Sequence, residues 1–157
     1  MKTFSSVLIL TALLLAPQWC ASWSGAVVGV TDGDTLTVMH HGRAERVRLY
    51  GIDCPEEGQD FGTRAKEFTS DLVFGKTVEV LPVGETSYGR PVVWVTVNGK
   101  SLNKELVRVG LAWWYRHFAP NESELAQLET TARKNKAGLW SQPNPVPPWE
   151  FRRITNK

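Results

Sequence analysis

The sequence predicts an α+β domain behind a short apolar leader. Apolar residues alternate with polar ones through much of residues 24–52 and 76–97, as in half-buried strands. Apolar residues three and four positions apart recur at 61–72, 102–109 and 125–132, as on one face of a helix. The chain has 157 residues and 42% hydrophobic content, which suits one domain with one core. We therefore expect the boundaries 1–22 for a signal peptide, 23–141 for the folded domain and 142–157 for a tail.

A hairpin is predicted from residue 35 to residue 52. Its strands alternate over 35–38 and 47–52, and Gly42 between them accepts a positive φ. Folding the strands back about Gly42 brings Thr35 roughly opposite residues 48–50. A slip of one residue would turn Arg48 to the other face, so the register decides what this side chain meets.

Charged side chains would then meet at one end of the hairpin, in a combination suited to phosphodiester hydrolysis. Asp34 and Asp53 offer hard oxygen ligands for Ca²⁺, and the backbone carbonyl of Cys54 could add another. Arg48 carries a forked, permanent charge that matches phosphate oxygens. Glu56 lies outside the ligand pair and could take a proton from an attacking water. Each feature alone has a plainer explanation as a turn, a cross-strand partner or a strand exit, but together they indicate chemistry.

These motifs make the chain resemble the staphylococcal-type thermonuclease family. The resemblance rests on Asp32-Gly33-Asp34-Thr35, on residues 47–56, on Tyr88-Gly89-Arg90, and on 103–112 and 136–140. It extends over about residues 25–141. It implies a five-stranded OB-type β-barrel with three helices, and Ca²⁺-dependent endonuclease action on DNA and RNA, in a secreted bacterial member of the family.

The resemblance also implies a role for each site residue. Two carboxylates and one backbone carbonyl would be the metal ligands. A general base would activate water, while two arginines stabilise the phosphate as charge builds. The implied catalytic residues are Arg48, Glu56 and Arg90, and the implied Ca²⁺ ligands are Asp34, Asp53 and Cys54.

Two tyrosines are candidates for substrate binding, because an aromatic face stacks on any nucleobase. Tyr88 precedes Arg90 in a turn, and it could equally brace that turn. Tyr115 lies in the aromatic cluster 113–118, where the family places tyrosines that contact substrate. Core packing accounts for at least one of the two tryptophans in that cluster.

The first 22 residues predict a signal peptide. Lys2 is followed by an apolar run over 7–16, about half of the roughly 20 residues needed to span a bilayer. Cys20 invites lipoprotein processing, but Trp19 directly before it is too bulky for that. We therefore expect a secreted or periplasmic monomer without a lasting membrane anchor. Cys54 would then be the only cysteine, without a disulfide and partly buried.

The net charge of the chain does not by itself indicate a polyanionic partner. Of 18 basic and 16 acidic side chains only Lys2 lies in the leader, so residues 23–157 hold 17 basic against 16 acidic ones. Binding of nucleic acid would rely on local basic clusters such as the pair Arg152 and Arg153, which solvated surface charge explains equally well.

The later elements are predicted from helix signals. The stripe over 61–72 ends at Gly75, and a second helix over 102–109 ends at Gly110. Residues 121–124 resemble a capping box that opens a third helix, after which Leu139 and Trp140 would pack on the barrel. The loop 57–62 is shorter than in the staphylococcal prototype, so the sequence does not reveal what supports Glu56. Four prolines by residue 148 predict an extended tail.

Two other functions compete with hydrolysis. A nucleic-acid or protein-binding module could keep the barrel and lose the chemistry, and an OB-type barrel could bind oligosaccharides. A binding module would be expected to lack one or more site residues. All five charged positions, which are Asp34, Arg48, Asp53, Glu56 and Arg90, are present here.

Overall fold

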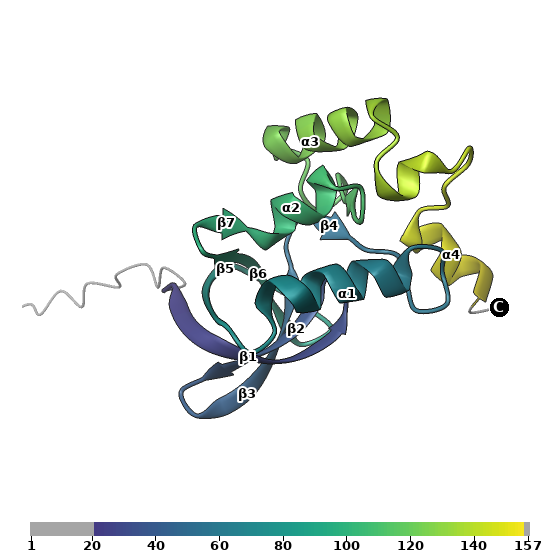
Figure 1. Cartoon of the computed structure of the whole chain (residues 1–157). Helices are drawn as coiled ribbons and strands as arrows, with labels where there is room; N and C mark the ends of the chain where they lie inside the picture. The colour runs from purple at the N-terminus through teal and green to yellow at the C-terminus, as the bar shows by residue number, and fades with distance from the viewer. Residues whose placement is uncertain (1–20, 156–157) are drawn as a thin grey trace, which may run out of the picture.

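The computed structural model describes residues 21–155, in which a β-barrel is flanked by four α-helices (Figure 1). The predicted signal peptide lies outside these residues, apart from its last two positions. The strands are β1 (Trp23–Asp32), β2 (Thr35–His40), β3 (Arg43–Leu49), β4 (Ile52–Asp53), β5 (Thr77–Ser87), β6 (Arg90–Val97), β7 (Lys100–Ser101) and β8 (Trp113–Trp114). The helices are α1 (Gly62–Val73), α2 (Leu102–Arg108), α3 (Ser123–Lys134) and α4 (Pro148–Thr155), with a 3₁₀ turn, η1, over Gly138–Ser141.

Five strands close into a barrel, which confirms the predicted fold class. The order β3-β2-β1-β5-β6 is antiparallel throughout, and a short parallel pairing of β3 with β6 closes the ring. β7 extends the edge of β6, while β4 and β8 form a separate pair. The closing pairing is short, because it joins only Arg48 to Val92 and Leu49 to Val93.

The predicted hairpin has the expected register. Thr35 pairs with Arg48, and the strands reverse at His41 and Gly42, whose φ values are 48° and 76°. Two successive positive φ values are typical of the tight turn that matches the twist of paired strands. The sequence signal at Gly42 was therefore sufficient to place this turn.

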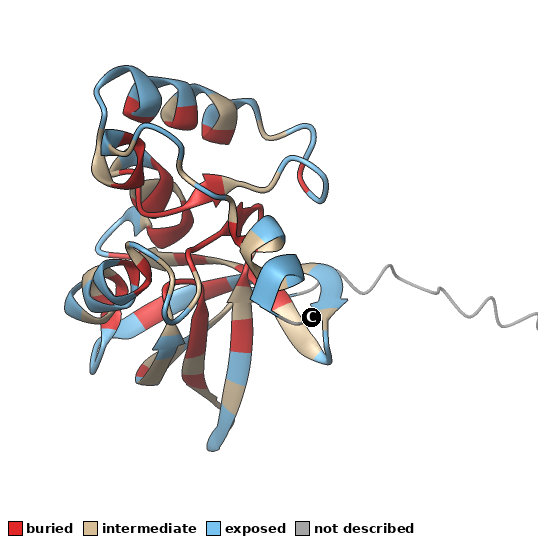
Figure 2. Cartoon of the chain, turned by 90° about the vertical axis from the view of Figure 1, so that its right-hand side faces the viewer, coloured by how far each residue is buried: buried red, intermediate tan, exposed pale blue. Residues whose placement is uncertain are grey.

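The core lies inside the barrel and between the barrel and α1 and α2 (Figure 2). One polar side chain is fully buried within it and ties three segments together. The Asn103 side chain accepts a hydrogen bond from the Val95 amide at 3.1 Å and donates to the carbonyls of Tyr50 (2.9 Å) and Val93 (3.2 Å). These bonds fix α2 against β6 and the end of β3, directly behind the candidate site.

Three local expectations were wrong. The α3 N-terminus has no side-chain capping bond, so the capping box does not form. Leu139 and Trp140 pack in a second apolar cluster with Trp113 and Ala132 instead of on the barrel core. The last part of the expected extended tail is the helix α4. Proline suits its first position, because a helix leaves that amide unbonded anyway.

Candidate active site

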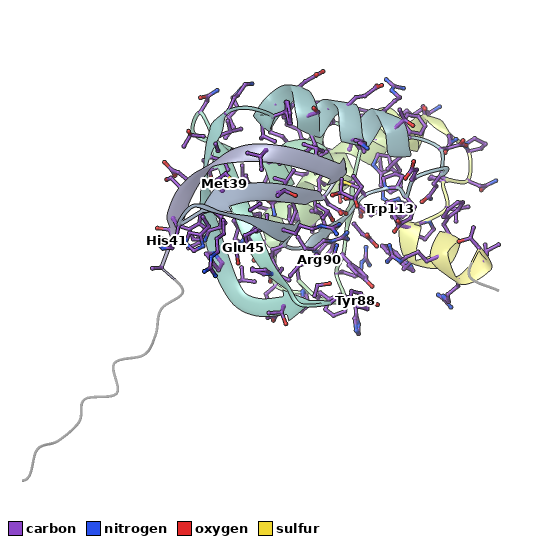
Figure 3. All side chains as sticks on the ribbon, turned by 90° about the horizontal axis from the view of Figure 1, so that it is seen from below. Met39, His41, Glu45, Tyr88, Arg90 and Trp113 are labelled. Atoms are coloured by element: carbon purple, nitrogen blue, oxygen red, sulfur yellow. The ribbon has the colours of Figure 1, made fainter. Side chains whose placement is uncertain are left out.

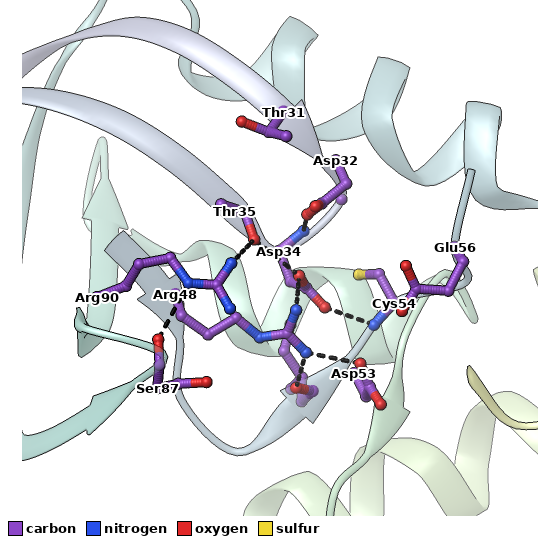
Figure 4. Close-up of polar contacts among 12 residues, drawn as sticks. Thr31, Asp32, Asp34, Thr35, Arg48, Asp53, Cys54, Glu56, Ser87 and Arg90 are labelled. Carbon is purple, nitrogen blue, oxygen red and sulfur yellow. Dashed lines mark hydrogen bonds and ion pairs between the residues drawn. The ribbon is translucent and has the colours of Figure 1, made fainter. Parts of the chain in front are cut away.

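A buried ion-pair cluster joins β3 to the two predicted carboxylates (Figure 4). One amino group of Arg48 donates a hydrogen bond to Asp34 Oδ1. The other amino group donates to Asp53 Oδ1, at a distance of 2.6 Å. Asp34 is 1% exposed and Asp53 is fully buried, while the Arg48 side chain keeps 17% of its surface exposed. The hairpin register thus brings together the three charges that the sequence predicted.

The backbone around Asp34 holds its carboxylate in place. The Asp34 amide donates to Asp32 Oδ1 at 3.1 Å, and the Cys54 amide donates to Asp34 Oδ2 at 2.7 Å. Gly33 permits this approach, since a Cβ there would lie 2.8 Å from the Cys54 side chain. Thr69 on α1 donates its hydroxyl to the Gly33 carbonyl at 2.7 Å. The Asp-Gly-Asp turn is therefore anchored from both sides.

Burial makes this cluster receptive to further positive charge. Burial raises the pKa of Asp34, and Arg48 opposes that rise only in part. Burial acts to lower the pKa of Arg48, but Asp34 and Asp53 together raise it above its ordinary value. An added cation would stabilise the Asp34 anion.

The donor set also fits a hard cation in kind. Carboxylate and carbonyl oxygens are the ligands that Ca²⁺ prefers. Within residues 21–155, no three carboxylate, imidazole or thiol side chains gather into a metal-binding group by themselves. A bound Ca²⁺ would thus need backbone or water oxygens beside Asp34 and Asp53, as predicted with the Cys54 carbonyl.

The Cys54 thiol is packed in the hydrophobic core. Its side chain is only 3% exposed, so it is more deeply buried than the sequence indicated. Burial raises the pKa of the thiol well above its ordinary value, with a smaller contribution from the Asp34 charge. The thiol is therefore held protonated and packed in the core, as a structural cysteine is.

Glu56 lies on the loop between β4 and α1. Its amide donates to Gln59 Oε1 at 3.0 Å, and Gly62 packs so closely on the Glu56 carbonyl that a Cβ at Gly62 would overlap it. The carboxylate itself contacts Arg152, which α4 supplies. The same guanidinium donates to Asp53 Oδ2 at 2.8 Å and Oδ1 at 3.3 Å.

A cavity of about 420 Å³ opens over this cluster. Five of the predicted site residues line it, whereas Asp34, Asp53 and Cys54 lie buried beneath. Three arginines face it with three acidic side chains, so it offers cationic groups for a phosphate beside a carboxylate base. The lining comprises Asp32, Arg48, Leu49, Tyr50, Ile52, Glu56, Glu85, Ser87, Tyr88, Arg90, Val92, Tyr115, Phe118 and Arg152.

Arg90 begins β6 at the cavity rim, and with Tyr88 it lies at the opposite end of the barrel from His41 and Glu45 (Figure 3). Its guanidinium donates to the Ser87 carbonyl at 3.1 Å and to Thr35 Oγ1 at 3.4 Å. Both partners are uncharged, so the charge of Arg90 remains available to an anion. The phosphate role of Arg90 stays a prediction.

Comparison with known proteins decides the family. The sequence profile described as "Staphylococcal nuclease homologue" matches residues 46–142, more than half of the chain. The chain belongs to the staphylococcal nuclease family. An Escherichia coli O157:H7 protein named "Uncharacterized endonuclease" is 42% identical over 137 residues, which cover 87% of this chain and 89% of that protein. A Shigella flexneri protein named "Micrococcal nuclease" is 38% identical over 153 residues, covering 91% of this chain and 87% of that protein.

The protein is thus a nuclease, a hydrolase of phosphodiester bonds, and its substrates are nucleic acids. The predicted family and enzyme class are confirmed. Among the helices of residues 21–155, none has the length and apolar character to cross a bilayer.

The two tyrosines of the nuclease occupy different settings. Tyr88 is 98% exposed, and the Arg90 guanidinium lies 5.9 Å from the centre of its ring. Tyr115 lines the cavity, but its ring already stacks on Trp149 of α4, with the ring centres 5.1 Å apart and the planes 3° from parallel. Of these two tyrosines, only Tyr88 therefore presents an almost fully exposed ring.

Arg152 is the residue of this site that sequence reasoning missed. It was noted only as part of a basic pair that surface charge could explain. The residue lies 96 positions after Glu56, and no motif or periodic pattern links the two segments. Desolvation acts to lower the pKa of Arg152, but hydrogen bonds and charge from Asp53 and Glu56 raise it above its ordinary value.

Proposed function

We propose that this nuclease is a Ca²⁺-dependent endonuclease that hydrolyses both DNA and RNA. The observation that carries the proposal is the convergence of Arg48 on two buried carboxylates, Asp34 and Asp53, beneath a cavity that Glu56 and Arg90 also line. Carboxylates, a candidate base and arginines are the groups that phosphodiester hydrolysis needs.

Asp34 and Asp53 would hold Ca²⁺, together with the backbone carbonyl of Cys54. Bound Ca²⁺ supplies a Lewis acid for the phosphate oxygens and helps to neutralise the charge that develops there. The fit rests on donor chemistry and on the buried Asp34 anion, which a cation would stabilise.

The remaining steps belong to side chains on the cavity wall. Glu56 accepts a proton from the water that attacks phosphorus in line with the leaving oxygen. Arg48 and Arg90 stabilise the charge on the phosphate oxygens as it builds, and a guanidinium does this without changing its own protonation. By resemblance to the family, cleavage leaves a 3′-phosphate.

Tyr88 and Tyr115 would bind bases next to the scissile phosphate. The exposed ring of Tyr88 can stack on any base, which suits action on both DNA and RNA. Tyr115 would present only the parts of its ring that Trp149 leaves free. Substitution of Tyr88 by Ala is expected to raise KM for short oligonucleotides while kcat changes little.

The leader supports export to the periplasm or the medium. Residues 1–22 combine a basic start with a short apolar run. Mass determination of protein recovered from cell fractions tests this proposal. A mature chain that begins near residue 23 outside the cytoplasm is expected, and an intact Met1 terminus in the cytoplasm would contradict it.

Digestion of single-stranded DNA and of RNA by purified residues 23–157 tests the function. Cleavage is expected with Ca²⁺ and should stop in chelator, while Asp34→Ala should weaken Ca²⁺ binding measured by calorimetry. Cleavage that persists in chelator would overturn the Ca²⁺ mechanism. Retained binding without any cleavage would favour the non-catalytic binding module.

A further inference from the structure

We propose that Arg152 is a positioning residue for Glu56, and that residues 142–155 brace the loop that carries this base. The inference rests on the role proposed for Glu56. It makes the C-terminal helix α4 a part of the active site, although no sequence motif marks it.

Glu56 needs support from another segment, because no residue of its own loop, 54–61, donates a hydrogen bond to its carboxylate. Residues 54–61 contain no helix or strand, and the Glu56 side chain is 34% exposed. Within the described chain, the only partner of its carboxylate is Arg152. Without that partner, a glutamate with this exposure would sample several rotamers, and holding one reactive geometry would then cost conformational entropy.

Arg152 connects this carboxylate to the rigid barrel. One amino group contacts both Glu56 and Asp53 Oδ1, and the other donates to Asp53 Oδ2 at 2.8 Å. Asp53 is fully buried and is also held by Arg48 at 2.6 Å. The planar guanidinium therefore fixes the distance and direction between the candidate base and a candidate Ca²⁺ ligand.

Two further contacts tie the same loop to the C-terminal segment. Gln59 accepts from the Glu56 amide at 3.0 Å and donates through Nε2 to the Val146 carbonyl at 2.7 Å. Gln142 donates to Asp60 Oδ2 at 2.7 Å. The loop from Glu56 to Asp60 is thus held at three points by residues 142–152. These contacts supply the support for Glu56 that the sequence did not reveal.

Aromatic packing anchors α4 itself. Trp149 stacks on Tyr115 and meets Trp113 edge-on, with ring centres 5.6 Å apart. Figure 1 shows α4 beside the loop that precedes α1. Since Trp113 belongs to β8, which pairs with β4, this packing connects α4 to the strand that carries Asp53.

The chain offers a matched control for Arg152. Arg153 is the next residue on the same helix, carries the same charge and is exposed to solvent. Arg152→Gln and Arg153→Gln therefore remove equal charge, but only the first removes the contacts with Glu56 and Asp53. Arg152→Lys keeps the charge but loses the planar guanidinium that contacts both carboxylates at once.

Steady-state cleavage of an oligonucleotide in saturating Ca²⁺ gives the first readout. Arg152→Gln should lower kcat by about tenfold to a hundredfold with little change in KM. Arg152→Lys should recover part of that loss, and Arg153→Gln should stay within twofold of the parent. Equal kcat for the two glutamine variants would overturn the inference.

A double-substitution test separates positioning from the two other roles that Arg152 could have. In a Glu56→Gln background, Arg152→Gln should cost little further kcat, because the two residues act as one unit. A further independent loss would mean that Arg152 binds the phosphate instead. A rise in kcat would mean that Arg152 blocks the site. Either result would overturn the inference.

Amide hydrogen exchange of the metal-free protein gives a readout that does not depend on activity. Exchange in a peptide covering residues 55–61 should be faster in Arg152→Gln than in Arg153→Gln, while the strands β2 and β3 stay equally protected. Unchanged exchange in the loop would contradict the brace. If the parent protein cleaved nothing, the proposed function would fail, but this measurement would still decide whether α4 supports the loop. If Arg152→Gln failed to fold, Arg152→Lys would take its place.

Discussion

Thr35 lies directly opposite Arg48 in the β2–β3 hairpin. This pairing sets the face of the sheet to which Arg48 points, and it places the guanidinium between Asp34 and Asp53. A shift of one residue would turn Arg48 away and leave two buried carboxylates facing each other. The register of one hairpin thus determines whether the site exists.

Arg48 is therefore expected to matter for stability as well as for catalysis. Arg48→Gln leaves Asp34 and Asp53 buried without their shared partner, and it should lower the free energy of unfolding by about 3 kcal/mol. Urea unfolding of the metal-free protein at pH 7 measures this change. Arg46→Gln on the same strand, where the side chain is exposed, should change stability by less than about 0.5 kcal/mol. Equal effects of the two substitutions would show that the buried ion pairs contribute nothing.

Asn103 should also contribute to stability, although it is not one of the proposed catalytic or metal-binding residues. Asn103→Ala removes a side chain that bonds the backbone of Tyr50, Val93 and Val95 in the core. Leaving these groups unpaired should cost about 3 kcal/mol in urea unfolding. Asn144→Ala, at an exposed position, is the control and should be nearly neutral. A small loss at Asn103 would mean that water replaces its bonds.

The Cys54 thiol should not react in the native protein. Burial raises its pKa, so the folded state keeps the proton at pH values where the unfolded chain releases it. Stability should therefore fall as pH rises above the thiol's usual pKa of about 8.5, and Cys54→Ala should remove that part of the alkaline loss. A disulfide reagent at pH 8 should label Cys54 in urea and leave it unlabelled in buffer. Rapid native labelling would contradict this account.

The sequence predicted those parts of the site that short-range signals control. Period-2 alternation and Gly42 located the hairpin, and the spacing of Asp34, Arg48 and Asp53 followed from it. The apolar stripe from Phe61 likewise located α1. These predictions depend on contacts between segments that are close in sequence or paired by one turn.

The contacts that sequence reasoning missed join distant segments. Arg152 reaches Glu56 across 96 positions, and the docking of α4 depends on Trp149 meeting Tyr115. Prolines over 143–148 indicated an extended tail, yet they end where Pro148 can start a helix. Local composition contains no information about which surface such a helix will find.

Turnover of Glu56→Gln tests the central claim most directly. Gln keeps an oxygen that can accept from Arg152 but cannot act as a base at neutral pH, so the loop should stay in place. With Ca²⁺ and substrate saturating, kcat should fall by about a hundredfold or more, while Ca²⁺ and DNA binding remain close to those of the parent. A kcat within twofold of the parent would contradict the account and remove Glu56 from the reaction.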